Sequence, residues 1–153
     1  MIGEELYGIY SNASAYIVFS DFERFVKYWR NEKGVKVAAL SNSDNRLRLL
    51  LKQMRLDCYF DHITTSDEVK SCKPEKEIFE RTLHRFGPSI LPEEVLHIGD
   101  DKVLDYEAAT GLGWRSLLIN RNLQNSLLET KHHECSNFDE ASSCIQLMFS
   151  RST

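Results

Sequence analysis

Hydrophobic positions recur along the chain with two alternating patterns, one typical of helices and one of short buried strands. Apolar side chains at helical spacing predict longer helices around residues 22–29, 47–54, 78–86 and 141–148, with a shorter helix over 105–111. Short apolar or β-like runs between them predict strands at residues 35–40, 62–65, 95–98 and 114–119. Strands that alternate with helices indicate an α/β fold with a Rossmann-like parallel sheet and helices on both faces.

Boundary signals support two of these helices. Ser20 is followed three residues later by Glu23, which is the pattern of a capping box, and Gly34 follows that helix. Gly87 follows the third helix, where a left-handed residue is wanted. A polar loop over residues 120–136 is expected before the last helix.

Polar residues follow the predicted strands at the point where each strand ends. Ser41 and Asn42 follow the first strand, Lys73 comes shortly after the second, and Asp100 and Asp101 follow the third. Ligands of open parallel sheets bind at the carboxyl ends of the strands. We therefore expect these side chains to share one edge of the sheet.

Three carboxylates at and just after the end of the third predicted strand are candidate metal ligands. Asp100, Asp101 and Asp105 are close in sequence and would repel one another without a cation, and oxygen ligands suit Mg²⁺. The other interpretation is that Asp100 or Asp101 caps a helix and Asp105 favours its N-terminus electrostatically. The spacing alone leaves both open.

The remaining polar residues suit a phosphate group. Ser41 and Asn42 offer a hydroxyl and then a helix N-terminus, which can bind phosphoryl oxygens, although such residues often only cap helices. Lys73 precedes a helix N-terminus, where a cation is electrostatically misplaced unless an anion offsets it. A solvated surface lysine is the alternative.

Composition narrows the function classes. The net charge of -4 and pI near 5.7 give no basic surface, so we expect no nucleic-acid partner and no membrane binding. Four dispersed cysteines indicate reduced thiols in a cytoplasmic protein, and His132, His133 and Cys135 fit a polar loop better than a zinc site. No G-x-G-x-x-G follows a strand, which argues against a dinucleotide site.

Three motifs in one order carry a resemblance to a known family. VAALSNSDNRL, SCKPEKEIFE and VLHIGDDKVLDYEAATGLGW resemble the second, third and fourth motifs of the haloacid-dehalogenase-like hydrolase superfamily, over almost the whole chain. Within it they look most like the group of haloacid dehalogenase-like hydrolase domain-containing protein 3. The opening run ELYGIYSNASAYIVFSDFERF resembles the tail of that group's helical cap. This implies a cap remnant at residues 1–19 and a single core domain at 20–153.

The resemblance also implies roles. Ser41 would bind the phosphoryl group, Lys73 would stabilise developing charge, and Asp100, with Asp101 or Asp105, would hold Mg²⁺. The implied ligand is a small phosphorylated metabolite, and the implied activity is magnesium-dependent phosphate-ester hydrolysis.

The family's first motif, an Asp-x-Asp after a strand, is absent from this chain. Asp21 and Glu23 imitate it, but the capping box explains them, and the short interval to Ser41 leaves no room for the expected flap or cap. We therefore assign no nucleophile and interpret the chain as the product of an N-terminal truncation or alternative splicing.

The missing motif has structural consequences in this family, because its strand lies centrally in the sheet. We expect a gap between the strands that carry Ser41 and Asp100, weak Mg²⁺ binding, possible self-association through the incomplete sheet, and little or no catalysis. The alternative is a non-catalytic module that binds phosphate or a partner chain.

Overall fold

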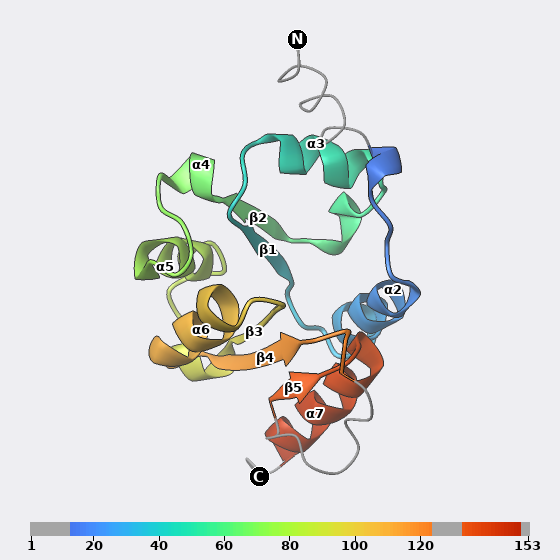
Figure 1. Cartoon of the computed structure of the whole chain (residues 1–153). Coiled ribbons are helices and arrows are strands. Elements are labelled where there is room, and N and C mark those ends of the chain that lie inside the picture. Colours follow the sequence, from blue (N-terminus) through green and yellow to red (C-terminus); the bar gives the residue numbers. More distant parts are fainter. Residues whose placement is uncertain (1–12, 124–132, 151–153) are drawn as a thin grey trace.

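The computed structural model describes residues 13–123 and 133–150, and its first four strands alternate with helices (Figure 1). The strands are β1 (Ala38–Ser41), β2 (His62–Thr65), β3 (Leu96–Gly99), β4 (Arg115–Ile119) and β5 (Glu134–Cys135). The α-helices are α2 (Ser20–Lys27), α3 (Arg46–Gln53), α4 (Ser66–Val69), α5 (Lys76–His84), α6 (Ala108–Gly111) and α7 (Phe138–Ser150). The shorter helical stretches are η1 (Ala13–Ala15), η2 (Tyr28–Glu32), η3 (Asp57–Tyr59), η4 (Pro92–Glu94) and η5 (Lys102–Glu107). The predicted α/β class is confirmed.

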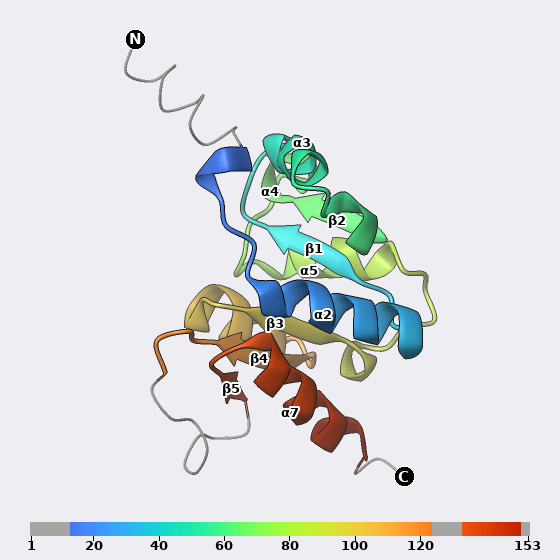
Figure 2. The same ribbon diagram turned by 90° about the vertical axis from the view of Figure 1, so that its right-hand side faces the viewer.

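The strands form two parallel sheets. β1 pairs with β2, with Ala38 opposite His62, while β3 pairs with β4, with Leu96 opposite Arg115, and β4 pairs with β5. In both ribbon views the strands follow one another in the order β2, β1, β3, β4, β5 (Figures 1 and 2). No ladder joins β1 to β3 in the described parts of the chain. The interruption lies where the missing strand was expected.

Helices cover both faces of this arrangement. In Figure 1, α5 and α6 lie on one side of the strands, and α2 and α7 lie on the other. The first buried core cluster joins β4, β5 and α7, with α2 packed against it; its buried members are Leu117, Ile119, Cys135, Ala141 and Ile145. The second joins α5 to α6 and to the residue just before β4; its buried members are Ile78, Phe79, Ala109 and Trp114. Leu40 of β1 packs against the second cluster, so α5 links the two sheets.

Several boundaries differ from the sequence-based expectation. Ser20 is already the first residue of α2, its N-cap is Phe19, and Glu23 pairs with Lys27 at 3.0 Å, so the capping-box prediction is wrong. The strand β5 lies inside the segment predicted as a polar loop. Gly87 does follow α5 with a positive φ of 110°.

The described helices do not include one that is long and apolar enough to cross a membrane. Of the proposed cap remnant, residues 1–12 lie outside the described part, and residues 13–15 form η1. The boundary at residue 20 therefore stays a prediction.

Candidate functional site

The loop after β1 holds the backbone of Lys73 through one side chain. Asn42 donates from Nδ2 to the carbonyl of Lys73 at 2.9 Å, and its Oδ1 accepts from the Lys73 amide at 2.7 Å. Both ends of the Asn42 amide are thus engaged by one residue. These bonds bring the end of β1 to Lys73, as predicted. The side chain of Asn42 fixes the backbone of Lys73.

The side chain of Lys73 reaches across to the second sheet. Its ammonium donates to Oδ1 of Asp105 in η5, and the two side chains are 13% and 4% exposed. An ammonium group has three donors, so this ion pair leaves others for a further anion. Lys73 therefore connects the loop after β1 to the segment after β3.

Asp105 is held by more than Lys73. His97 of β3 lies with Nε2 2.8 Å from Oδ1 of Asp105, and the Asp101 amide donates to Oδ2 at 3.1 Å. Burial alone would raise the pKa of Asp105, but hydrogen bonds from His97, Lys73 and the Asp101 amide outweigh it and hold that pKa well below its usual range. Asp105 is therefore an ionised carboxylate at neutral pH.

Gly99 is required by this packing. A Cβ added to Gly99 would lie 2.2 Å from Cγ of Asp105, closer than any real contact. The side chain of Asp105 thus occupies the space in front of the end of β3. Any larger residue at position 99 would displace the carboxylate.

Ser41 is the last residue of β1 and pairs in register with Thr65 of β2. It is half-buried, and its hydroxyl makes no hydrogen bond to another residue within the described ranges. The next residue, Asn42, bonds to the backbone of Lys73, so the end of β1 and Lys73 lie at the same edge of the sheet. Its phosphate-binding role remains a prediction.

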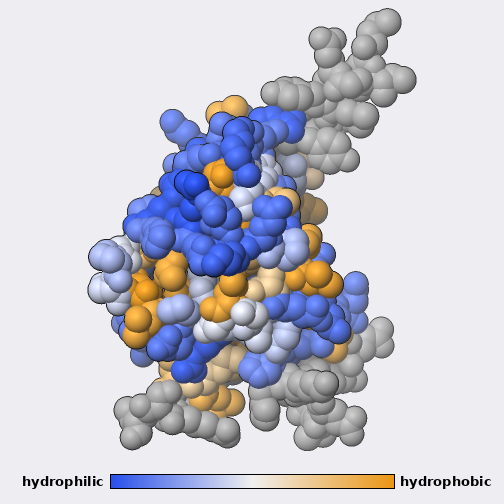
Figure 3. Space-filling view, turned by 90° about the vertical axis from the view of Figure 1, so that its left-hand side faces the viewer, coloured by the Kyte–Doolittle hydropathy of each residue, from blue (hydrophilic) through white to orange (hydrophobic). Residues whose placement is uncertain are grey.

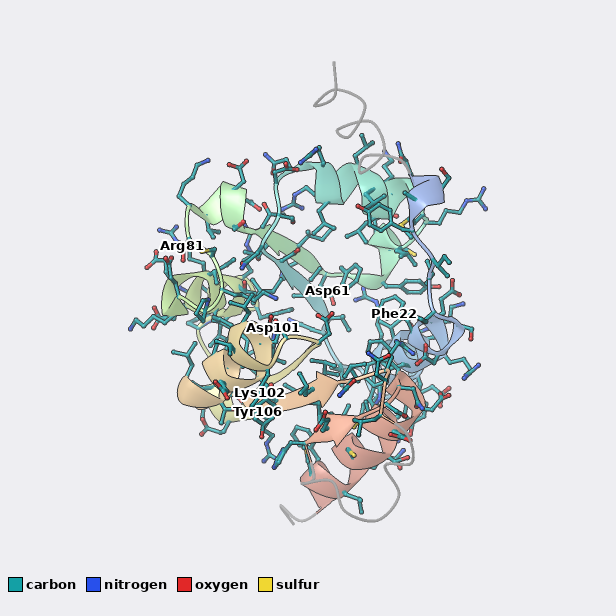
Figure 4. The ribbon with its side chains drawn as sticks, in the orientation of Figure 1. Phe22, Asp61, Arg81, Asp101, Lys102 and Tyr106 are labelled. Carbon is teal, nitrogen blue, oxygen red and sulfur yellow. The ribbon has the colours of Figure 1, made fainter. Side chains whose placement is uncertain are left out.

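The other two predicted acids have different surroundings. Asp101 accepts with Oδ1 from the amides of Val103 and Leu104, both at 2.8 Å, and so caps η5 (Figure 4). Asp100 is exposed. Capping by an aspartate is one of the two interpretations that the spacing left open.

These acids do not form a tight magnesium site as they stand. Residues 13–123 and 133–150 contain no cluster of three acidic, histidine or cysteine side chains able to hold a metal ion. Asp105 is occupied by Lys73 and His97, and one oxygen of Asp101 by the cap, whereas Mg²⁺ requires near-octahedral oxygen ligands. His132 of the other metal-like sequence lies outside the described residues.

Asp21, the imitation nucleophile, has a structural position. Its Oδ1 accepts from Nη2 of Arg121 at 3.1 Å, and its Oδ2 accepts from the Phe138 amide, the start of α7, at 2.9 Å. Burial raises its pKa, but these two donors outweigh that effect and lower it. Asp21 is 7% exposed, and its two oxygens join α2 to Arg121, which follows β4, and to the start of α7.

His97 was not singled out from the sequence. Its one signal is a polar residue inside the apolar run VLHI, directly before the Gly99-Asp100 pair. Edge-on contacts to Phe79, at 5.5 Å, and Trp114, at 6.5 Å between ring centroids, place it in the wall of the site.

Comparisons with known proteins identify the family and the fold. A family model described as a haloacid dehalogenase-like hydrolase matches residues 1–113. Haloacid dehalogenase-like hydrolase domain-containing protein 3 of Bos taurus is 34% identical over 118 residues, covering 77% of this chain and 46% of that protein. The crystal structure of the HAD phosphatase from Thermococcus onnurineus has a TM-score of 0.73 at 29% identity, covering 84% of this chain and 58% of that one.

A second similar solved structure contains magnesium. The putative HAD-hydrolase YfnB from Bacillus subtilis, whose crystal structure is bound to magnesium, has a TM-score of 0.68 at 18% identity, over 82% of this chain and 54% of that one. At that identity the likeness shows the fold alone. The chain spans about half the length of the Bos taurus relative.

Proposed function

Because the chain belongs to the haloacid dehalogenase-like hydrolase family, we propose that it presents the phosphate-binding edge of a magnesium-dependent phosphatase-type site. The observation that carries this proposal is the connection from Asn42 through Lys73 to Asp105. It holds one ammonium group, little exposed to solvent, between the loop after β1 and the segment after β3. Ser41, the last residue of β1, is the proposed second contact to phosphate. The ligand would be a small phosphorylated metabolite.

Catalysis in this chain is proposed to be absent or strongly impaired. Formation of an aspartyl-phosphate needs a carboxylate oxygen free to attack phosphorus. The sequence has no Asp-x-Asp, and both oxygens of Asp21 are engaged by Arg121 and the amide of Phe138. Lys73 could stabilise charge on a phosphoryl group, but no side chain is assigned to begin the reaction.

A combined assay tests both parts. We expect p-nitrophenyl phosphate turnover at background level with Mg²⁺ present, while inorganic phosphate produces chemical-shift changes at Ser41 and Lys73 in NMR spectra. Lys73→Met should remove these shifts, whereas Lys70→Met, at an exposed lysine bonded to Asp67, is the matched control. Robust turnover that survives Asp21→Asn would show that another group is the nucleophile.

Magnesium binding is proposed to be weak. The support is that Asp100 is an exposed carboxylate at the end of β3, while Asp101 and Asp105 already have protein partners. Titration calorimetry with MgCl₂ should show low affinity, further reduced by Asp100→Asn. Tight, stoichiometric binding would contradict this part of the proposal.

The second candidate function is a non-catalytic module that binds a partner chain. The interruption between β1 and β3 favours it, because unpaired strand edges accept other strands. Self-association is the simplest form, and sedimentation velocity should show mass rising with concentration. A well-folded monomer at all concentrations, insensitive to phosphate and Mg²⁺, would contradict both candidates.

A cytoplasmic location is part of the proposal. Its support is chemical: Cys58, Cys72, Cys135 and Cys144 are all free thiols in the structure, as expected in a reducing compartment.

A further inference from the structure

His97 makes a buried contact for which neither the sequence motifs nor the comparisons provide a role. Its side chain is 10% exposed and meets the carboxylate of Asp105, which is 4% exposed. An ionised carboxylate only accepts hydrogen bonds, so His97 donates from Nε2 to Oδ1. The same oxygen also accepts from the ammonium of Lys73.

We propose that His97 is a positioning residue, which fixes the carboxylate of Asp105 and through it the direction of the Lys73 ammonium. This inference rests on the proposed phosphate-binding edge. Among the hydrogen bonds of the described residues, the His97 side chain bonds to Asp105 and not to Lys73, so its influence on the ammonium runs through Asp105.

The ring of His97 is suited to this role because its own position is fixed. Phe79 packs against it edge-on, with an interplanar angle of 74°, and Trp114 packs on it at 65°. Its backbone lies in the β3 ladder with β4. A donor on a paired strand and packed against two aromatic rings has little freedom to follow a moving carboxylate.

The other contacts of Asp105 are less able to fix it. Lys73 has a long flexible side chain, and the Asp101 amide bonds to the second oxygen, Oδ2. Without a donor from β3, the carboxylate could rotate and take the ammonium with it. The expected result is a looser site with its charges unchanged.

A matched pair of substitutions isolates the donor. His97→Gln keeps an N–H group at similar reach, whereas His97→Met has similar length and no donor. We expect His97→Met to weaken inorganic phosphate binding about tenfold, as for loss of a hydrogen bond to a charged group, and His97→Gln to restore most of it. His62→Met on β2, whose ring contacts Phe86, is the control for removal of a histidine.

A second measurement does not depend on phosphate. The Asp101 amide donates to Oδ2 of Asp105, so its hydrogen exchange reports on the carboxylate. His97→Met should speed this exchange about tenfold, while His97→Gln and His62→Met leave it near the wild-type rate. If the Met variant does not fold, His97→Asn, whose donor is too short to reach, replaces it in the comparison.

The outcomes separate the two proposals. Faster exchange at Asp101 without phosphate binding by the wild-type chain would support the positioning role and overturn the phosphate proposal. Unchanged exchange and unchanged phosphate affinity in the donorless variant would overturn the positioning role while leaving phosphate binding intact. Equal losses in the Gln and Met variants would also overturn it, because packing rather than the donor would then be responsible.

Discussion

The two sheets differ in the hydrophobic core that packs against them. In the three-stranded sheet, Leu117, Ile119 and Cys135 belong to a buried core cluster completed by α7. In the two-stranded sheet, β2 is buried over Ile63–Thr65, yet none of these residues belongs to either cluster. The first sheet therefore has a core of its own, whereas the second depends on α5.

The strands on either side of the interruption, β1 and β3, are less buried than their neighbours. Every residue of β1 and β3 is only half-buried, while the outer neighbours β2 and β4 contain fully buried residues. Strands in the middle of a parallel sheet are normally buried on both faces. The interruption between β1 and β3 thus removes cover from the strands that should have most of it.

The difference gives the candidate site a second role. Across the interruption, the contact from Asn42 through Lys73 to Asp105 joins the loop after β1 to the segment after β3. Helix packing joins the sheets as well, since Phe22 of α2 contacts Phe60 ahead of β2 and Phe138 of α7.

On the face seen in Figure 3, hydrophobic residues gather in the lower half, while the upper part is mainly hydrophilic.

The largest expected effect on stability comes from removing a side chain of α5, the helix that links the two sheets. Phe79 of α5 is fully buried and contacts His97 and Trp114, in the cluster that also receives Leu40 of β1. Phe79→Ala should lower the free energy of unfolding by about 3–5 kcal/mol, measured by urea denaturation. Phe86→Ala, at a half-buried ring that contacts His62, is the control, and an equal cost there would refute the assigned role of α5.

A second prediction compares the sheets directly. Leu117→Ala should cost about 2–5 kcal/mol because it opens a cavity in the core of the three-stranded sheet. Ile63→Ala on β2 should cost less, near the lower end of that range, because Ile63 lies outside both clusters. Hydrogen exchange should show the β1–β2 amides opening without global unfolding, whereas the β3–β4 amides exchange only with it. Uniform protection across both sheets would contradict this.

The sequence predicted the elements and the interruption better than the contacts within the site. Apolar or β-like runs located four strands to within three residues of their observed bounds. β5 has only two residues, Glu134 and Cys135, and no periodicity can identify so short a strand. The capping box failed because its pattern fits equally well when Ser20 begins the helix and Glu23 pairs with Lys27.

The site shows the same limit. The positions of Asn42 and Lys73 after predicted strands indicated a shared edge, and the structure brings these two residues together. The contact of Lys73 with Asp105 was not predicted. The role of His97 could not be predicted, because its contact with Asp105 depends on how η5 turns back over the end of β3. For Asp101, capping and metal binding have the same sequence pattern, and only coordinates show the cap.

Acid should loosen the connection between the sheets. The pKa of Asp105 is lowered in the folded chain, so its contribution to stability is present above the unfolded value of about 3.9 and is lost as pH falls below it towards the folded pKa. Unfolding free energy should therefore drop by about 1–3 kcal/mol from this group between pH 5 and acid conditions. Asp105→Asn should start less stable and show a shallower fall, and Asp57→Asn, at an exposed residue, is the control. Parallel acid curves for wild type and Asp105→Asn would contradict the assignment.

The smallest effect distinguishes two buried hydroxyls, one in each sheet. Thr64 of β2 is fully buried, and its Oγ1 has no hydrogen-bond partner among the described residues. Ser116 of β4 is 4% exposed and donates to the His97 carbonyl at 3.3 Å. Thr64→Val keeps the shape and removes an unpaired polar atom, so it should raise the free energy of unfolding by about 1 kcal/mol. Ser116→Ala should lower it by about 1 kcal/mol.

Thermal and urea denaturation of these two variants measure both signs. A stabilising Thr64→Val together with a destabilising Ser116→Ala would show that the buried hydroxyl of the two-stranded sheet is unpaired and destabilising. The corresponding hydroxyl of the three-stranded sheet would be hydrogen-bonded and stabilising. If Thr64→Val were destabilising instead, Oγ1 would have a partner in solution, such as a bound water, and the cost assigned to β2 would disappear. The weakness of the smaller sheet would then rest on its missing core and open edge alone.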